Sequence, residues 1–227
     1  MGKRSISENK QQIMMKLAKK FFDPEIIFDD ESVLNFIINN PCIIISNHSK
    51  RTKTNKLTSC DGPMVRYALG NCNICSLMGA DLMKNPFFKA VVSGCDCIPV
   101  SRTAASTDWL HQCMQKLRDG VSVIIFPEGT TFKEKEVDTF KPGFALLAGM
   151  SDVPVIPVAI AGKYRIFSKS KLIIRIGSPI TLELNKKTKA EYEKETLRFQ
   201  KIIEKMHTEM NQPLANSYQS THKNLSL

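Results

Sequence analysis

The sequence predicts an α/β fold, in which helices cover one mixed, mostly parallel sheet and an N-terminal amphipathic helix precedes it. The length of 227 residues suits one large domain. Several strand-sized segments are apolar at nearly every position, as in strands that are buried on both faces. The spacers between these segments have the length of helices, which is typical of α/β proteins.

The candidate strands and helices follow from this pattern. The strands are expected at residues 42–46, 74–78, 97–100, 121–126, 155–160 and 172–176. The helices between them are expected at about residues 62–70, 81–92, 104–119 and 142–150, and a last, charged helix at 187–210.

The first part of the chain contains an amphipathic pattern that is separate from the alternating strands and helices. Between Gln11 and Phe22, apolar residues recur at spacings of three and four, and lysines occupy the other side. This pattern predicts a short cationic amphipathic helix, which Asp23-Pro24 ends. Such a helix either packs on the domain or lies in the plane of a membrane surface. We therefore divide the chain into a helix and lead-in (1–30), a domain (31–212) and a disordered tail (213–227).

The net charge of +10, from 32 Lys and Arg against 22 Asp and Glu, indicates an anionic partner or a solvated lysine-rich surface. Nucleic acid is not favoured, because only 7% of residues are aromatic and these lie in apolar runs, apart from the basic residues. No apolar run reaches the roughly 18 residues needed to span a bilayer, and no secretory signal pattern is present. We expect a peripheral protein on the cytoplasmic side of a membrane.

The sequence contains seven cysteines, which could in principle form a metal or redox site. Cys72 and Cys75 form a C-x-x-C pair, and Cys95 and Cys97 follow about twenty residues later. A zinc site would need two such pairs at ligand spacing in turns. Cys75 and Cys97 instead begin apolar, strand-like runs. Packing in the core is the expected role, and no metal is expected.

The residues most indicative of chemistry lie at the ends of predicted strands, where ligands bind in open α/β sheets. His48 comes just after the first strand, and Asp61 follows before a helical segment. A carboxylate that accepts the Nδ1–H of a histidine leaves Nε2 free to take a proton from an alcohol. His48 and Asp61 are therefore candidates for a catalytic pair.

Three further segments offer groups for binding a phosphorylated substrate. Arg102 follows a strand and carries a planar set of donors that suits phosphate. The segment 126–130, Phe-Pro-Glu-Gly-Thr, joins a strand to Gly129, where a ligand can approach the backbone closely, and to the hydroxyl of Thr130. Lys141 could supply a second cation for phosphate.

Together these segments resemble the motif blocks of the glycerolipid acyltransferases. The matching strings occur in the family's order: Asn47-His48 with Asp61, Gly94 to Arg102, Phe126 to Thr130, and Val153-Pro154-Val155-Ile156-Pro157-Val158. The resemblance covers about residues 41–182. It implies an α/β acyltransferase fold, acyl-CoA or acyl-carrier protein as donor, and no cofactor.

The resemblance also implies roles for single residues. His48 would be the general base and Asp61 its partner, while Arg102, Glu128 and Gly129 would bind the glycerol-phosphate acceptor. Thr130 and Lys141 complete the expected substrate site. Glu128 could either bond an acceptor hydroxyl or brace the turn.

One departure from the family pattern concerns the spacing of the catalytic pair. The family has four residues between the histidine and the aspartate, whereas twelve residues stand between His48 and Asp61 here. At the family spacing the chain has Lys53, which cannot accept a hydrogen bond from imidazole. We read the extra residues as a loop insertion, since each doubling of loop length costs only about 0.6 kcal/mol. The alternative is a broken pair in an inactive, lipid-binding homologue.

The expected reaction moves a fatty acyl group from acyl-CoA or acyl-carrier protein to the free hydroxyl of 1-acyl-glycerol-3-phosphate, making phosphatidic acid. Two alternatives remain within the enzyme class. The acceptor could be a lysophospholipid with a larger headgroup, or the reaction could be transacylation between phospholipids.

Overall fold

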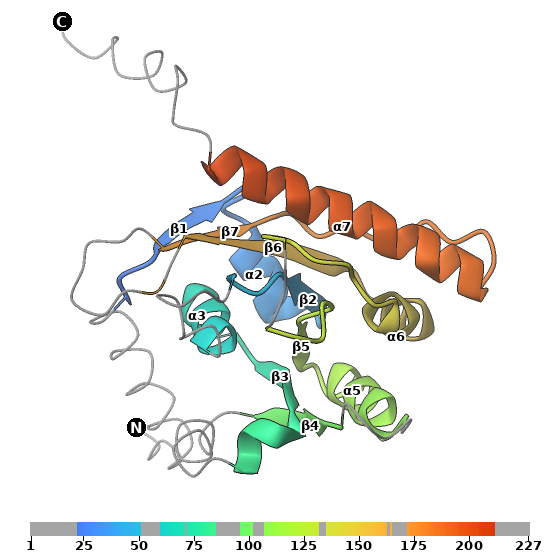
Figure 1. Cartoon of the computed structure of the whole chain (residues 1–227). Coiled ribbons are helices and arrows are strands. Elements are labelled where there is room, and N and C mark those ends of the chain that lie inside the picture. The colour runs from blue at the N-terminus through green and yellow to red at the C-terminus, as the bar shows by residue number, and fades with distance from the viewer. Residues whose placement is uncertain are drawn as a thin grey trace, which may run out of the picture.

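The computed structural model describes residues 22–50, 60–70, 72–84, 96–101, 107–131, 135–162, 164 and 172–211. Within these residues the chain forms one seven-stranded sheet in the order β1-β7-β6-β2-β5-β3-β4, with helices on both faces (Figure 1). Every neighbouring pair is parallel except β6 and β7. The predicted α/β class with a mixed, mostly parallel sheet is confirmed.

The elements lie close to their predicted positions. The strands are β1 (Glu25–Phe28), β2 (Ile43–Ser46), β3 (Ile74–Gly79), β4 (Cys97–Val100), β5 (Ser122–Ile125), β6 (Val155–Gly162) and β7 (Leu172–Ile176). The helices are α2 (Val33–Asn39), α3 (Asp61–Ala68), the short 3₁₀ helix η2 (Ala80–Lys84), α5 (Asp108–Arg118), α6 (Gly143–Ser151) and α7 (Lys189–Asn211).

Two elements, β1 and α2, were not among those predicted from the sequence. β1 has four residues at the edge of the sheet and none of them is fully buried. Its apolar run, residues 26–28, is only three residues long and has an acidic residue on each side, so it did not stand out as a strand. α2 has seven residues, about two turns, which is too short for a helical repeat to stand out. The helix expected at 81–92 is represented by η2, and residues 85–92 lie outside the described residues. The expected N-terminal helix and C-terminal tail lie outside them as well.

The core explains why the central strands are apolar at every position. Ile43 and Ile45 of β2 face α5, α6 and α7, whereas Ile44 faces α2 and α3 on the other side of the sheet. All three side chains are completely buried. Because side chains of a strand alternate between faces, a sheet covered on both sides needs apolar residues at successive positions.

The topology brings the motif segments together at the carboxyl ends of the parallel strands. β2 lies between β5 and β6 and is parallel to both, with Ile45 opposite Ile125 and Ser46 opposite Val158. The carboxyl ends of these three strands therefore lie together. His48 follows β2, the segment 126–130 follows β5, and Tyr164 follows β6.

Candidate active site

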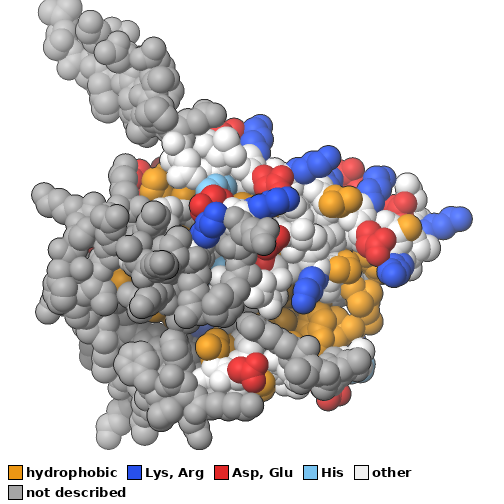
Figure 2. Space-filling view, viewed as in Figure 1, with side chains coloured by type: hydrophobic (Ala, Val, Ile, Leu, Met, Phe, Trp, Pro, Cys, Tyr) orange, Lys and Arg blue, Asp and Glu red, His pale blue; other side chains and the backbone are white. Residues whose placement is uncertain are grey.

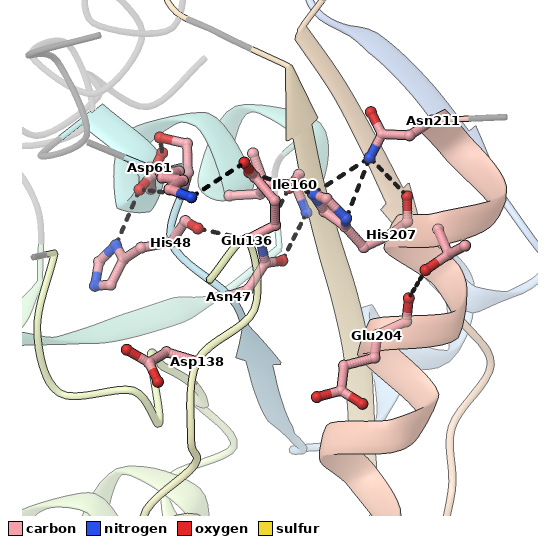
Figure 3. A network of polar contacts seen from close by, with 12 residues as sticks. Asn47, His48, Asp61, Glu136, Asp138, Ile160, Glu204, His207 and Asn211 are labelled. Atoms are coloured by element: carbon pink, nitrogen blue, oxygen red, sulfur yellow. Dashed lines mark hydrogen bonds and ion pairs between the residues drawn. The ribbon is translucent and has the colours of Figure 1, made fainter. Parts of the chain in front are cut away.

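His48 and Asp61 meet at the carboxyl ends of these strands. Nδ1 of His48 lies 2.9 Å from Oδ2 of Asp61, the first residue of α3 (Figure 3). Asp61 is completely buried, and the His48 side chain is 14% exposed. Because a carboxylate can only accept, Nδ1 carries the proton, and Nε2 is on the opposite edge of the ring. The expected contact across the insertion is present, while the catalytic roles stay predictions.

Asp61 accepts hydrogen bonds from two residues that the sequence analysis did not identify. Ser49 donates its backbone N–H to Oδ2 at 3.0 Å and its hydroxyl to Oδ1 at 2.9 Å. The hydroxyl of Tyr164 donates to Oδ1 at 2.7 Å. Burial, followed by the nearby charge of Asp61, raises the pKa of Tyr164 well above its usual value, so this hydroxyl keeps its proton. No sequence motif marks either residue.

Asn47 fixes the backbone that leads into His48. Its side chain accepts the backbone N–H of Ile160 at 2.9 Å and donates to the carbonyl of Ile160 at 3.0 Å (Figure 3). Both bonds are buried, and they continue the pairing of β2 with β6 by one further residue. The asparagine of the first motif thus holds the end of β2 against β6, which places His48 beyond the sheet edge.

Glu128 lies next to His48 and contacts its backbone. Oε2 accepts the backbone N–H of His48 at 2.8 Å, and Oε1 accepts the backbone N–H of Asp138 at 3.0 Å. The side chain is only 3% exposed. Because both oxygens bind backbone groups of two different segments, the contacts favour a bracing role for Glu128 over direct contact with the acceptor.

We expect Glu128→Gln to lower kcat about tenfold and the melting temperature by roughly 5 °C, with little change in the KM of the acceptor. Glutamine offers one acceptor oxygen, so its NH₂ group would face one of the two backbone N–H groups. Steady-state kinetics and thermal unfolding measure the two effects. Glu136→Gln, in the same loop at a side chain that is 57% exposed, is the matched control. A raised acceptor KM at unchanged stability would instead indicate that Glu128 binds substrate.

Three further expected site residues, Gly129, Thr130 and Lys141, lie beyond the end of β5, next to Phe126. The ring of Phe126 stacks on the His48 ring, with centroids 4.2 Å apart and planes at 12°. Gly129 has φ +67°, a conformation that favours glycine, and the half-buried Thr130 follows it. The ammonium of Lys141 lies 3.0 Å from the point where a side chain at Gly129 would begin. The structure therefore places this lysine beside the turn, as a phosphate site would need.

Arg102 lies outside the described residues. It follows β4, which ends at Val100 and is separated from β5 by β3. Its expected role in binding the acceptor stays a prediction.

Four of the six described cysteines are buried in the core, whereas Cys60 and Cys97 are half-buried. All six of them are free thiols, and Cys75 of β3 is completely buried in the same core cluster as Cys113 of α5. Burial raises the pKa of the Cys75 thiol to about 11, which disfavours the reactive thiolate. Among the described residues, no group of three His, Cys, Asp or Glu side chains is placed to hold a metal ion.

A half-buried histidine paired with a buried aspartate lies at the carboxyl ends of parallel strands, next to a Pro-Glu-Gly-Thr turn, and this arrangement is the one expected of an acyltransferase domain. The chain belongs to the acyltransferase family, whose model matches residues 23–161. The matched span contains both members of the pair and the whole of segment 126–130.

Three relatives show which acyltransferases this chain is similar to. The chain is 27% identical over 130 residues to the chloroplastic 1-acyl-sn-glycerol-3-phosphate acyltransferase BAT2 of Brassica napus, covering 56% of this chain and 35% of the relative. It is 28% identical over 135 residues to the 1-acyl-sn-glycerol-3-phosphate acyltransferase of Pseudomonas aeruginosa, covering 58% and 49%. It is also 28% identical over 138 residues to an N-acylphosphatidylethanolamine synthase of Arabidopsis thaliana, covering 57% and 45%. The chain thus spans half or less of the length of these relatives.

A solved structure agrees with the fold. The crystal structure of the 1-acyl-sn-glycerophosphate acyltransferase PlsC from Thermotoga maritima superposes with a TM-score of 0.63. The superposition covers 92% of this chain and 81% of that chain, at 19% sequence identity. At this identity the likeness establishes the fold alone.

Proposed function

We propose that this chain transfers a fatty acyl group from acyl-CoA or acyl-carrier protein to the free hydroxyl of 1-acyl-glycerol-3-phosphate. The observation that carries the proposal is the 2.9 Å contact between His48 and Asp61, present despite the long insertion between them. The names of the relatives from Brassica napus and Pseudomonas aeruginosa support this acceptor.

The chemistry needs one proton acceptor and one activated acyl donor. The acceptor hydroxyl oxygen forms a bond to the thioester carbonyl carbon while its proton passes to Nε2 of His48. Asp61 stabilises the resulting imidazolium through Nδ1. The tetrahedral intermediate then breaks its carbon–sulfur bond, and the leaving thiolate takes the proton from His48. A thioester is already activated, so direct attack in a ternary complex suffices without an acyl-enzyme.

The acceptor phosphate needs cations near this centre. Lys141 beside Gly129 is one such group in the described structure, and Arg102 is the second that we propose. The hydroxyl of Thr130 is a further donor in the same turn. Cations also flank the pair in the sequence, since the segment between Lys50 and Cys60 carries Arg51, Lys53 and Lys56.

A second candidate acceptor is the amine of phosphatidylethanolamine. The relative from Arabidopsis thaliana, an N-acylphosphatidylethanolamine synthase, matches at an identity similar to that of the two 1-acyl-sn-glycerol-3-phosphate acyltransferases. A histidine base can activate an amine as it activates a hydroxyl.

A thiol-release assay tests the proposal. Purified protein is mixed with acyl-CoA and, in separate reactions, with lysophosphatidic acid, lysophosphatidylcholine, lysophosphatidylethanolamine or phosphatidylethanolamine. Fastest release with lysophosphatidic acid, together with phosphatidic acid as product, supports the proposal. Fastest release with another acceptor reassigns the substrate. Thiol release with none of them, from acyl-CoA or from acyl-carrier protein, would leave only a lipid-binding role.

We also propose that the protein works at a membrane surface, where both substrates reside. No helix of the described residues is both long and apolar enough to cross a bilayer. On the face shown in Figure 2, basic and acidic side chains alternate along α7, with pairs such as Lys189 and Glu193. The excess positive charge of the chain lies instead in segments outside the described residues, notably 1–21, 51–59 and 165–171.

We therefore expect the protein to sediment with anionic vesicles, and binding to weaken at least tenfold when salt is raised or residues 1–20 are removed. Residues 1–20 contain six Lys or Arg and one Glu, and each cation near an anionic surface contributes about 1 kcal/mol. The deletion keeps Phe22, because its ring packs edge-on against Tyr164 at 5.1 Å. Neutral phosphatidylcholine vesicles are the control. Binding that neither salt nor the deletion changes would contradict this proposal.

A further inference from the structure

Tyr164 is a buried residue of the site that no motif contains. It lies two positions beyond β6, is 2% exposed, and donates its hydroxyl to Oδ1 of Asp61 at 2.7 Å. The span that matches the family model ends at residue 161, before Tyr164. The contact joins residues that are 103 positions apart in the chain.

The hydrogen bonds of Asp61 show what this hydroxyl adds. Oδ2 accepts from Nδ1 of His48 and from the backbone of Ser49, and Oδ1 accepts from the hydroxyls of Ser49 and Tyr164. These four bonds match the acceptor capacity of a carboxylate. Three of them come from His48 and Ser49, which are neighbours in one loop. The fourth comes from the end of β6 and ties the carboxylate to the sheet.

The tyrosine ring itself is held in place. It packs in the core between the sheet and helices α2 and α3, and the ring of Phe22 contacts it edge-on at 5.1 Å and 81°. β6 pairs with both β2 and β7, so the strand that precedes Tyr164 has a neighbour on each side. A hydroxyl held by this packing, two residues after a strand that is paired on both sides, can define where the carboxylate of Asp61 sits.

The long insertion makes such a fixed point useful. A twelve-residue connection between His48 and Asp61 is inexpensive in entropy, but it constrains the relative placement of its ends less than a single turn would. Productive geometry for a general base requires the ring and its partner to be held within about 0.5 Å. The sheet provides this constraint for His48 through Asn47, and for Asp61 through Tyr164.

We propose that Tyr164 is a positioning residue, which fixes the Asp61 carboxylate so that it holds the His48 ring with Nδ1 protonated and Nε2 directed to the acceptor. This inference rests on the proposed function, since it assigns Tyr164 to the same reaction.

Tyr164→Phe removes the hydroxyl and keeps the ring. We expect kcat to fall about 10- to 100-fold, the size expected for one hydrogen bond to a charged group, while KM for both substrates stays within about twofold. Tyr192→Phe is the matched control, because Tyr192 is a buried tyrosine of α7 on the other face of the sheet. It should keep near wild-type kcat. A Tyr164→Phe variant with wild-type kcat, or one with unchanged kcat and raised KM, would overturn the proposal.

A double-mutant cycle separates positioning from a general effect on folding. In an Asp61→Ala background, Tyr164→Phe should change kcat by less than about twofold, because its effect passes through the carboxylate. Labelled acyl-CoA extends the assay to low rates. An equal fold-loss in both backgrounds would show that Tyr164 does not act through Asp61.

A measurement independent of activity distinguishes this proposal from the proposed function. The long-range ¹H–¹⁵N spectrum of the imidazoles reports the tautomer of each of the four histidines, and His48→Gln assigns the His48 signals. Tyr164→Phe should shift the His48 signals, and Tyr192→Phe should not. If the wild-type protein releases no thiol, the proposed function fails; if the His48 signals are the same in Tyr164→Phe and wild type, the positioning role fails.

Discussion

Replacing His48 by alanine should lower kcat about 10²- to 10⁴-fold, the usual contribution of a general base, while KM for acyl-CoA changes by no more than a few fold. In the structure, Nδ1 of His48 is engaged by Asp61, so Nε2 is the nitrogen that would accept the hydroxyl proton. Alanine removes this acceptor, and the attacking oxygen must then lose its proton to water. The backbone N–H of His48 donates to Glu128 without any part of the imidazole, so this hydrogen bond should persist in the variant.

The His48 result is measured by thiol release at saturating lysophosphatidic acid and acyl-CoA, with His111→Ala as the control. His111 is an exposed histidine of α5 and should tolerate the change. The melting temperature of His48→Ala is compared with that of the wild type, since the Phe126 ring loses its stacking partner. Near-normal turnover by folded His48→Ala would exclude this residue as the base.

The sequence was sufficient to predict the features that repeat along the chain. Six of the seven strands were located within two residues, because a sheet covered on both faces leaves continuous apolar runs such as 42–45. The meeting of His48 and Asp61 was also predicted, since His48 directly follows a buried strand and Asp61 begins the helix that comes next in the chain.

Features that depend on side-chain direction could not be predicted in this way. Tyr164 is an ordinary residue after a strand until the fold places its hydroxyl against Asp61. Ser49 follows His48 directly, yet nothing in the local pattern shows that its hydroxyl turns back to the same carboxylate. The contacts of Glu128 with two backbone N–H groups likewise arise from tertiary packing. Each of these contacts is made by a single side chain in the folded protein, so it leaves no repeating pattern in the sequence.

Asp61 offers the second large effect, and its two substitutions should differ in a way that tests the network. Asp61→Ala leaves His48, Ser49 and Tyr164 without their shared acceptor. The imidazole loses both its orientation and its counter-charge, and kcat should fall about 10³- to 10⁴-fold, within the range expected for loss of the general base itself. Each buried donor left unpaired costs about 1–3 kcal/mol, so the assay temperature must lie well below the measured melting temperature.

Asp61→Asn should be milder, with kcat lowered about 10²-fold. The amide NH₂ group can occupy the position of Oδ1, where the hydroxyls of Ser49 and Tyr164 can rotate to accept from it. The opposite orientation would set the NH₂ group against the backbone N–H of Ser49, which cannot accept. The favoured orientation therefore keeps an oxygen facing Nδ1 of His48, and only the charge is lost.

This orientation makes a prediction about the histidine tautomer as well as about rate. In Asp61→Asn, the imidazole spectrum should still show His48 protonated at Nδ1, because the amide oxygen accepts from it. Adding Tyr164→Phe removes one of the two hydroxyls that accept from the amide, so the amide should turn more readily and part of His48 should become protonated at Nε2. That form cannot take a proton from the acceptor, and kcat of the double variant should fall below that of Asp61→Asn. Protonation at Nε2 already in Asp61→Asn would contradict the assigned hydrogen bonds, because it would require the Ser49 N–H to face another donor.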